Sequence, residues 1–326
     1  MEIRSIAIVA LVSVSAVCTT FYLQGALENT DATAQGVAKI RHYEALHKPS
    51  MRLYYDPYAS YMYKGSFVQT WLGEEGTRWI YNLAMKGVLE SLTIRTKWLD
   101  DEIMKAINDK NATQMVILGA GYDTRGFRLD FPDEFCIIEV DQPAVQNMKR
   151  KKLERISKEY EQVASRMNAE SGIVKFLEID FNKDSVGTKL TESNSPFNRV
   201  KPTILILEGV TQCVPKMSTA STLAQLRKII PPHSTLLVSY VPQNVLDNPA
   251  KYAVVNIAKY AGEKWISGWT AQGFKSFLDE LGYEVMSDSI ISDLSDKYLA
   301  PLNRSLDSNE IPSIERYVTA VVKTDD

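Results

Sequence analysis

Two glycines separated by one residue, Gly119 and Gly121, stand where an apolar run gives way to polar residues. Glycine permits the positive backbone angles of a tight turn, and its missing side chain lets a ligand approach the main chain. A helix that begins after such a turn presents unpaired N–H groups. Gly119-Ala120-Gly121 therefore predicts a turn that holds a polar ligand, although the same pattern also fits a tight turn without one.

A third glycine does not follow this pair. The fingerprint of dinucleotide sites places it at position 124, where the chain has Thr124. A ligand that carries no pyrophosphate does not require that glycine. The departure argues against a nicotinamide-dependent oxidoreductase, which is the first alternative that such a turn raises.

An acidic residue, Asp141, ends the next strand-like run, twenty-two residues after Gly119. A carboxylate in this position accepts hydrogen bonds from the ribose hydroxyls of a bound nucleoside. Glu139, two residues earlier, is the alternative for the same role. We favour Asp141 because it lies at the carboxyl edge of the predicted strand. The pair of features indicates an adenosine-containing ligand and does not distinguish one such ligand from another.

Two more acidic residues end later runs. Asp180 is followed by Phe181, so that its carboxylate would accept from the exocyclic amine of adenine with an aromatic ring nearby. The alternative is an ordinary residue of a strand-end turn. Glu208 ends the next run at the edge that faces the cleft in a doubly wound sheet, unless it is a surface or helix-capping residue.

The elements that must position these residues alternate along the chain from residue 114 onward. Apolar runs that suit a buried parallel sheet are separated by helical segments. The predicted strands are 114–118, 135–140, 174–179, 203–207 and 235–240. The longest predicted helix runs from Pro143 to about residue 170, another covers 218–230, and residues 35–110 are mostly helical in pattern.

Two further strand-like runs, 283–291 and 315–324, end the chain with no good helix between them. A parallel partner would need a crossover helix, so the pair predicts an antiparallel closure of the sheet. The expected fold is α/β, with a doubly wound, mostly parallel seven-stranded sheet, an antiparallel terminal strand and a helical N-terminal extension. A nicotinamide-binding domain would continue with a sixth parallel strand instead.

The N-terminus differs from the rest of the chain. Residues 5–23 carry no charge, and a helix of that length rises roughly 28 Å, close to one hydrocarbon thickness. We predict an uncleaved membrane anchor, with a signal or targeting peptide and a soluble mature protein as the alternative. The domain boundaries follow as 1–28 for this segment and 29–326 for the remainder, divided into a helical cap at 29–112 and a core at 113–326.

The composition argues against a nucleic-acid partner, a metal site and a disulfide framework. The net charge is −3 and no basic stripe appears, which argues against nucleic acid. The densest basic run, residues 149–152, is followed by acidic residues and predicts one face of a solvated helix. With three cysteines in no CxxC pair and three histidines, we expect no metal site and no disulfide framework.

Taken together, these stretches resemble the leucine carboxyl methyltransferase family, in particular its bacterial members of unassigned substrate. The order and spacing of the motifs match over roughly residues 30–325. The segments that carry the resemblance are 34–38, 55–59, 94–97, VILGAGYDTRGFRL at 116–129, EVDQP at 139–143, EID at 178–180 and PTILILEGV at 202–210. The resemblance implies a class I methyltransferase fold and S-adenosylmethionine as the cofactor.

The resemblance also implies roles for residues. Arg95 would pair with the methionine carboxylate of the cofactor, with a surface helix charge as its alternative, and Arg41 or Lys48 would supply a second cation. Gly119, Ala120 and Gly121 would face the amino-acid portion of the cofactor.

Of the acidic residues, Asp141 would bind the ribose, Asp180 with Phe181 the adenine, and Glu208 the region near the amino group. Tyr122 falls inside the signature loop of the family, which lies within the stretch VILGAGYDTRGFRL at 116–129. Its neighbour Asp123 would instead cap the following helix.

A carboxylate acceptor would be ionised at neutral pH and would attack the sulfonium methyl without a strong base, so that catalysis would rest on orientation. We therefore expect O-methylation of a carboxylate on a small molecule or a peptide C-terminus. A hydroxyl acceptor would need a base, for which Glu208 or a tyrosine such as Tyr122 are the candidates.

Departures from the family leave the acceptor open. Methylation of the C-terminal leucine of a protein phosphatase is the first alternative, but residues 211–214 read Thr-Gln-Cys-Val where those members have an apolar stretch ending in tyrosine. Residues 243–272 predict a lid. A non-catalytic nucleotide-binding protein is the alternative of another class, and it would have lost Arg95 or Asp141, which are both present.

Overall fold

A single mixed sheet organises the chain in the computed structural model, which describes residues 32–65, 67–84, 87–180, 183–260, 263–306 and 313–324. Within these residues the strand order is β3-β2-β1-β4-β5-β7-β6. The strands are β1 (Gln114–Leu118), β2 (Cys136–Asp141), β3 (Val174–Glu178), β4 (Thr203–Leu207), β5 (Thr235–Tyr240), β6 (Tyr283–Ile290) and β7 (Arg316–Val322).

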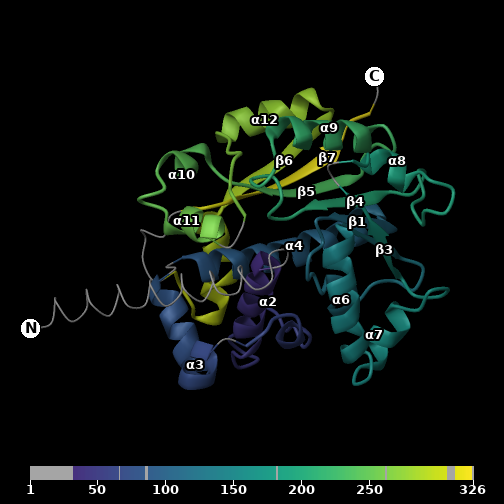
Figure 1. Cartoon of the computed structure of the whole chain (residues 1–326). Helices are drawn as coiled ribbons and strands as arrows, with labels where there is room; N and C mark the ends of the chain where they lie inside the picture. Colours follow the sequence, from purple (N-terminus) through teal and green to yellow (C-terminus); the bar gives the residue numbers. More distant parts are fainter. Residues whose placement is uncertain are drawn as a thin grey trace, which may run out of the picture.

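Helices cover both faces of this sheet (Figure 1). The helices α8, α9 and α12 lie on one face, and α2, α4 and α6 lie on the other. Their bounds are α2 (Ala32–Ala45), α3 (Phe67–Ala84), α4 (Val88–Lys110), α5 (Arg125–Arg128), α6 (Pro143–Ile156), α7 (Glu161–Arg166), α8 (Val186–Leu190), α9 (Lys216–Arg227), α10 (Gln243–Asp247), α11 (Ala253–Tyr260), α12 (Ala271–Glu280) and α13 (Ile291–Tyr298). Two short 3-10 turns, η1 (Ala59–Tyr61) and η2 (Ala300–Leu302), complete the described elements.

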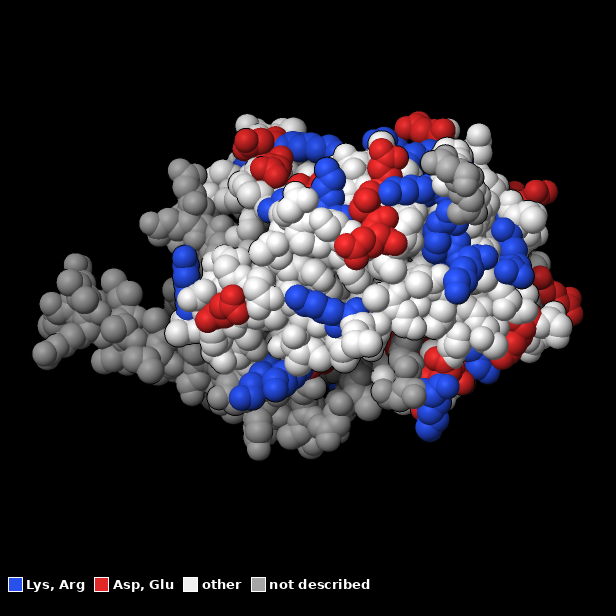
Figure 2. All heavy atoms as spheres, turned by 90° about the horizontal axis from the view of Figure 1, so that it is seen from above, with Lys and Arg blue, Asp and Glu red and all other residues white. Residues whose placement is uncertain are grey.

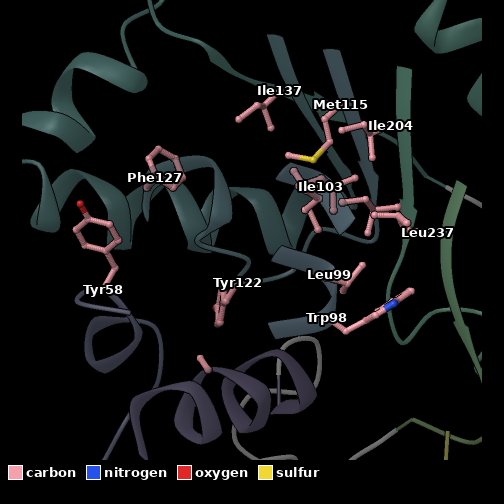
Figure 3. Close-up of a cluster of buried hydrophobic side chains, with 14 of the residues drawn as sticks. Tyr58, Trp98, Leu99, Ile103, Met115, Tyr122, Phe127, Ile137, Ile204 and Leu237 are labelled. Carbon is pink, nitrogen blue, oxygen red and sulfur yellow. The ribbon is translucent and has the colours of Figure 1, made fainter. Parts of the chain in front are cut away.

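The central strands are apolar at every position because both of their faces are covered. In β1, Met115 and Ile117 pack toward α4, whereas Val116 and Leu118 pack toward α9 and α12. Successive side chains of a strand point to opposite faces, so a strand between two helical layers needs an unbroken apolar run. Figure 3 shows Met115 on the same side as Ile103 of α4.

The terminal strands close the sheet as the sequence predicts. β7 inserts between β5 and β6 and runs antiparallel to both, with Leu237 opposite Thr319 and Tyr283 opposite Val322. The other neighbouring strands are parallel. The expected α/β class, with a doubly wound, mostly parallel seven-stranded sheet and an antiparallel terminal strand, is confirmed.

Two helix predictions were wrong in detail. A helix, α13, does lie between the two terminal strands; it starts directly after β6, and the Asp293 carboxylate accepts from the Ile290 N–H at its first turn. The long helix predicted from Pro143 is two helices, α6 and α7. The chain is extended between them at Tyr160, whose ring packs edge-on against Tyr58, so a tertiary contact overrides the helical pattern.

The basic run after β2 was also misread. Lys149 is 1% exposed, and its ammonium lies 2.5 Å from a carboxylate oxygen of Glu139 in β2. Its position on α6 directs the side chain toward the sheet, so this part of the run is not a solvated face. On the outer surface shown in Figure 2, Lys and Arg alternate with Asp and Glu.

The apolar N-terminal segment, residues 5–23, lies outside the described residues. Within the part of the chain that the structure does describe, no helix is both long enough and apolar enough to cross a membrane. The predicted membrane anchor and the domain boundary at residue 28 stay predictions.

Candidate active site

A cavity of about 460 Å³ opens at the carboxyl ends of β1, β2 and β4. Its volume falls within the range of roughly 300–1,000 Å³ that is typical of small-molecule sites. The turn after β1, the end of β2 and the loop after β4 form its base, and α2, α4, α11 and Trp265 form its walls. Ligands of doubly wound sheets bind at this edge, where the strand order reverses.

The turn after β1 has the positive backbone angles that its glycines predict. Gly119 and Gly121 have φ angles of 66° and 46°. A Cβ atom on Gly119 would lie 2.7 Å from Val210 Cγ2, and one on Gly121 would lie 3.4 Å from the Cβ of Ala34. The turn is therefore packed between the loop after β4 and helix α2, and both glycines, together with Ala120, line the cavity.

Replacement of Gly119 by alanine should lower the free energy of unfolding by about 1–3 kcal/mol, because the new Cβ combines a positive φ with a contact to Val210. Urea denaturation of the full chain measures this loss. The double variant Gly119→Ala/Val210→Ala should regain only that part of the lost unfolding free energy that comes from the contact with Val210. An unchanged unfolding midpoint in the single variant would show that the turn can relax.

Asp141 ends β2 beneath this turn. Its Oδ2 accepts from the Gly121 N–H over 2.6 Å, and its Oδ1 accepts from the Gln142 N–H over 2.7 Å. Burial raises the pKa of Asp141, although these two hydrogen bonds oppose the shift. A carboxylate has about four lone-pair sites, so both oxygens can still accept from a ligand. The alternative residue, Glu139, faces Lys149 and does not line the cavity.

Glu208 follows β4 and lies between two arginines. Its Oε1 accepts from Arg95 Nε over 2.8 Å, and its Oε2 accepts from Arg125 Nη1 over 2.6 Å. Burial would raise the pKa of Glu208, but the guanidiniums of Arg125 and Arg95 outweigh it and hold the pKa below the ordinary value. A carboxylate in this state is a weak base, and it suits charge recognition better than proton abstraction.

A buried residue that the sequence did not indicate completes this group. Glu315, which is 1% exposed and directly precedes β7, accepts from Arg95 Nη1 with both oxygens, at 2.7 and 2.8 Å. Arg95 itself lies in α4, so the contact spans 220 residues of chain. Arg95 is thus a buried cavity residue and not a surface helix charge.

Arg125 extends the ion-pair group toward the signature loop. It pairs with Asp123 and Asp100 as well as with Glu208. The Asp123 Oδ1 also accepts from the Arg125 N–H over 2.6 Å, so the predicted role of Asp123 at the helix start agrees with the geometry. One nitrogen of Arg125, Nη2, is buried and has no hydrogen-bond partner among the described residues.

Of the two candidates for a second cation, Arg41 lines the cavity. Its Nη2 donates to the Tyr122 carbonyl oxygen over 2.5 Å, and its Nε pairs with Asp56 at 2.9 Å. Asp56 in turn accepts from the Thr124 hydroxyl over 2.6 Å. The other candidate, Lys48, is exposed and does not line the cavity.

Two predicted site residues are placed differently, and a third is not described. The Tyr122 side chain is 2% exposed and belongs to the apolar core, as Figure 3 shows, while its main chain joins the glycine turn. Asp180 follows β3, outside the cavity lining, and forms an ion pair with Lys183 at 3.0 Å. Phe181 lies outside the described residues. The catalytic role of Tyr122 and the adenine role of Asp180 stay predictions.

This sheet order, with β7 antiparallel between β5 and β6 and a glycine turn after β1, defines the class I methyltransferase fold. A solved protein of the DUF574 family from Streptomyces avermitilis superimposes with a TM-score of 0.55 at 13% identity, over 88% of this chain and 97% of that one. A provisionally named methyltransferase from Thermobifida fusca gives 0.53 at 13% identity, over 82% and 93%. At this identity the likeness concerns the fold alone.

The family is shown by the sequence comparison. The family model described as leucine carboxyl methyltransferase matches residues 34–227, and the chain belongs to this family. A provisionally named S-adenosyl-L-methionine-dependent methyltransferase of Mycobacterium tuberculosis is 29% identical over 208 residues, which are 64% of this chain. The chain spans about half the length, 52%, of that relative. The predicted family is confirmed.

Proposed function

We propose that the protein transfers the methyl group of S-adenosylmethionine to an oxygen atom of a small acceptor. The observation that carries the proposal is that one cavity is lined by the Gly119–Gly121 turn, the Asp141 carboxylate and the Arg95–Glu208 pair. The glycine turn matches the amino-acid portion of this cofactor, and the Asp141 carboxylate matches its ribose. The Arg95–Glu208 pair matches the carboxylate and ammonium groups of the amino-acid portion.

The residues of the cavity fit such a cofactor. The buried Nη2 of Arg125 and the buried Oε1 of Gln212 line the cavity and lack partners among the described residues, so a polar ligand would satisfy them. Asp141 would accept from the ribose hydroxyls. Arg95 would bind the α-carboxylate and Glu208 the ammonium group. When bound, the cofactor supplies an electrophilic methyl group on a positively charged sulfur.

The chain's own contribution is binding and orientation. The low pKa of Glu208 keeps its negative charge available for the ammonium group at neutral pH. The arginines hold that carboxylate in one position, since both of its oxygens receive guanidinium N–H groups. Fixing the reacting atoms in this way replaces a bimolecular encounter by a nearly unimolecular step.

The acceptor side of the cavity is mainly apolar. Ile40 of α2, Val88 and Leu92 of α4, and Ile314 line it together with Trp265. These walls support a small acceptor with an apolar body. The name of the family supports the expected carboxylate as the group that is methylated, either on a small molecule or on a peptide C-terminus such as that of a protein phosphatase.

The charges of the cavity instead support a neutral hydroxyl. The described cations that line it are Arg41, Arg95 and Arg125, and each is already paired with at least one carboxylate. Moving an acceptor carboxylate into a site without a further cation is costly. A hydroxyl acceptor avoids this cost but requires a hydrogen-bond acceptor or base.

Titration calorimetry of the full chain tests the cofactor. We expect S-adenosylmethionine to bind and NADH not to bind, because the turn lacks the third glycine of the dinucleotide fingerprint. Binding of NADH alone would overturn the proposed function in favour of an oxidoreductase. Absence of binding by either would favour a chain that has kept the fold without the activity.

Asp141→Ala should weaken S-adenosylmethionine binding by roughly 1–3 kcal/mol, the cost of leaving ribose hydroxyls and the Gly121 N–H unpaired. Calorimetry at neutral pH measures the change. Asp133→Ala, at an exposed position, is the matched control and should bind as the natural chain does. Unchanged affinity in Asp141→Ala would remove the ribose role from this residue.

A further inference from the structure

A segment beyond α11 closes the cavity and introduces a carboxyl group that the roles above do not use. The Ile266 and Ser267 N–H groups donate to the Gln212 carbonyl oxygen over 2.7 and 3.2 Å, and the Ser267 hydroxyl donates to the Val214 carbonyl oxygen over 2.6 Å. These contacts fix the segment on the loop after β4. Glu263 at its start therefore lines the cavity.

The Glu263 carboxyl group faces polar and acidic neighbours. Its Oε2 accepts from the Cys213 thiol, with the sulfur 3.6 Å away. Burial raises the pKa of Glu263 and the nearby Asp141 carboxylate adds to the shift, while Thr33 and Cys213 lower it. Within the part of the chain that the structure describes, no Lys or Arg forms an ion pair with Glu263.

The Cys213 thiol is held as a hydrogen-bond donor. Burial and the Glu263 carboxylate raise its pKa well above the ordinary value, so the sulfur keeps its proton at neutral pH. A carboxylate has about four lone-pair sites, so Glu263, which accepts from the Cys213 thiol and from Thr33, keeps acceptor capacity for a ligand. Cys213 also lines the cavity, and its thiol orients the Glu263 carboxylate.

A second observation concerns an acceptor at this end of the cavity. The side-chain oxygen of Gln212, which is 4% exposed, has no partner among the described residues. Gln212 lines the same cavity as Glu263. Buried acceptors without partners are rare in native structures, and a ligand that carries a donor would satisfy this oxygen.

We propose that Glu263, oriented by Cys213, binds a hydroxyl group of a ligand in this cavity. The inference rests on the proposed function for the nature of the ligands. Two of them carry hydroxyl groups: the ribose of the cofactor, beside Asp141, and a hydroxyl acceptor such as a phenol against the apolar wall near Trp265. The shared chemistry is an O–H donor that meets a half-buried carboxylate, with which no described Lys or Arg forms an ion pair.

If the hydroxyl belongs to the acceptor, Glu263 also receives its proton. The acceptor oxygen forms its bond to the methyl carbon while the carbon–sulfur bond breaks, and that electron pair goes to sulfur. The O–H proton passes to a Glu263 oxygen, which leaves a neutral carboxyl group and a methyl ether. Its raised pKa makes Glu263 a stronger base than an ordinary carboxylate.

Calorimetry with Glu263→Gln distinguishes the two sources. A roughly tenfold loss in affinity for S-adenosylhomocysteine, the usual effect of removing a hydrogen bond to a charged group, assigns the hydroxyl to the ribose. If that affinity is unchanged, the loaded protein is titrated with 2-naphthol and 2-naphthoate. A preference for the naphthol that Glu263→Gln abolishes assigns the hydroxyl to the acceptor. No difference between Glu263→Gln and the natural chain with any of these probes overturns the inference.

The control is Glu280→Gln, at an exposed position of α12, which should match the natural chain throughout. Failure of the natural chain to bind S-adenosylhomocysteine at all would overturn the proposed function rather than the role of Glu263. A readout that needs no cofactor separates failure of the proposed function from failure of the role of Glu263. This readout is the rate at which iodoacetamide alkylates each cysteine.

In the free protein, Glu263→Gln should lower the pKa of the Cys213 thiol and speed its alkylation at mildly alkaline pH, because a neighbouring negative charge is removed. Cys136, at the start of β2 and near the Pro196 carbonyl, is the internal control. Cys213→Ser keeps a donor to Glu263 and should keep the affinity, whereas Cys213→Ala should not. An unchanged alkylation rate at Cys213 would show that Glu263 does not face it.

Discussion

Arg95→Met should abolish measurable cofactor binding and lower the free energy of unfolding by about 3–5 kcal/mol, the usual cost of removing one partner of a buried ion pair. Arg95 is 4% exposed and holds both Glu208 and Glu315. Without it, Glu315 is left as a buried carboxylate, and Glu208 keeps only Arg125. Urea denaturation and calorimetry with S-adenosylmethionine measure the two losses.

A second substitution separates stability from recognition in this prediction. The double variant Arg95→Met/Glu315→Gln removes the stranded charge and should regain a large part of the stability, because the two residues are directly paired. It should not regain cofactor binding, since the guanidinium itself is missing. Recovery of binding in the double variant would contradict the role of Arg95 toward the cofactor carboxylate.

Arg95→Lys adds a geometric test. The guanidinium reaches Glu208 through Nε and Glu315 through Nη1, two directions that a single ammonium group cannot replace. We expect intermediate stability and weak binding from this variant. Stability equal to that of the natural chain would show that charge alone holds the two carboxylates.

The parts of the site that the sequence revealed are local. The glycines of the turn after β1 and the acid at the end of β2 are fixed by strand periodicity, because a strand end determines which residues reach the carboxyl edge of the sheet. Asp141 was preferred to Glu139 on that ground, and Asp141 is the residue that lines the cavity. Arg95 was found only through the resemblance to the family. It lies within a helix, where periodicity does not determine which residue reaches the site.

The residues that were missed depend on long-range contacts. Glu315 precedes the last strand, and nothing in the sequence near it indicates that β7 returns between β5 and β6 to meet α4. Glu263 reaches the cavity because its segment pairs with Gln212 across the loop after β4. Lys149 was misassigned for the same reason, since its partner Glu139 comes from a neighbouring element. Periodicity identifies a face of an element but not what that face meets.

The second prediction with a large effect concerns Asp56, which connects the N-terminal helices to the signature loop. Its side chain is fully buried, and it receives Arg41 Nε at 2.9 Å, the Thr124 hydroxyl at 2.6 Å and the Tyr58 N–H at 3.0 Å. Arg128 Nε lies 3.9 Å from the same carboxylate. Removing its charge should therefore loosen α2 from the turn that follows β1.

Asp56→Asn should lower the free energy of unfolding at neutral pH by about 3–5 kcal/mol, because the buried Arg41 loses its carboxylate partner and Arg128 keeps only Asp100. Burial alone would raise the pKa of Asp56, but the two guanidiniums and the Thr124 hydroxyl outweigh it and hold the pKa below the ordinary value. The folded chain therefore binds this proton less readily than the unfolded chain does.

The sign of the pH dependence follows from that lowered pKa. The stabilisation by Asp56 is fully present above the pKa that the residue has in the unfolded chain, about 3.9, and is lost as the pH falls below it toward the folded value. The difference in unfolding free energy between the natural chain and Asp56→Asn should hence shrink under acid conditions. Urea denaturation at neutral pH and well below pH 4 checks this, with the exposed Asp133→Asn as the control. A difference that stays constant with pH would mean that the loss comes from packing and not from the buried charge.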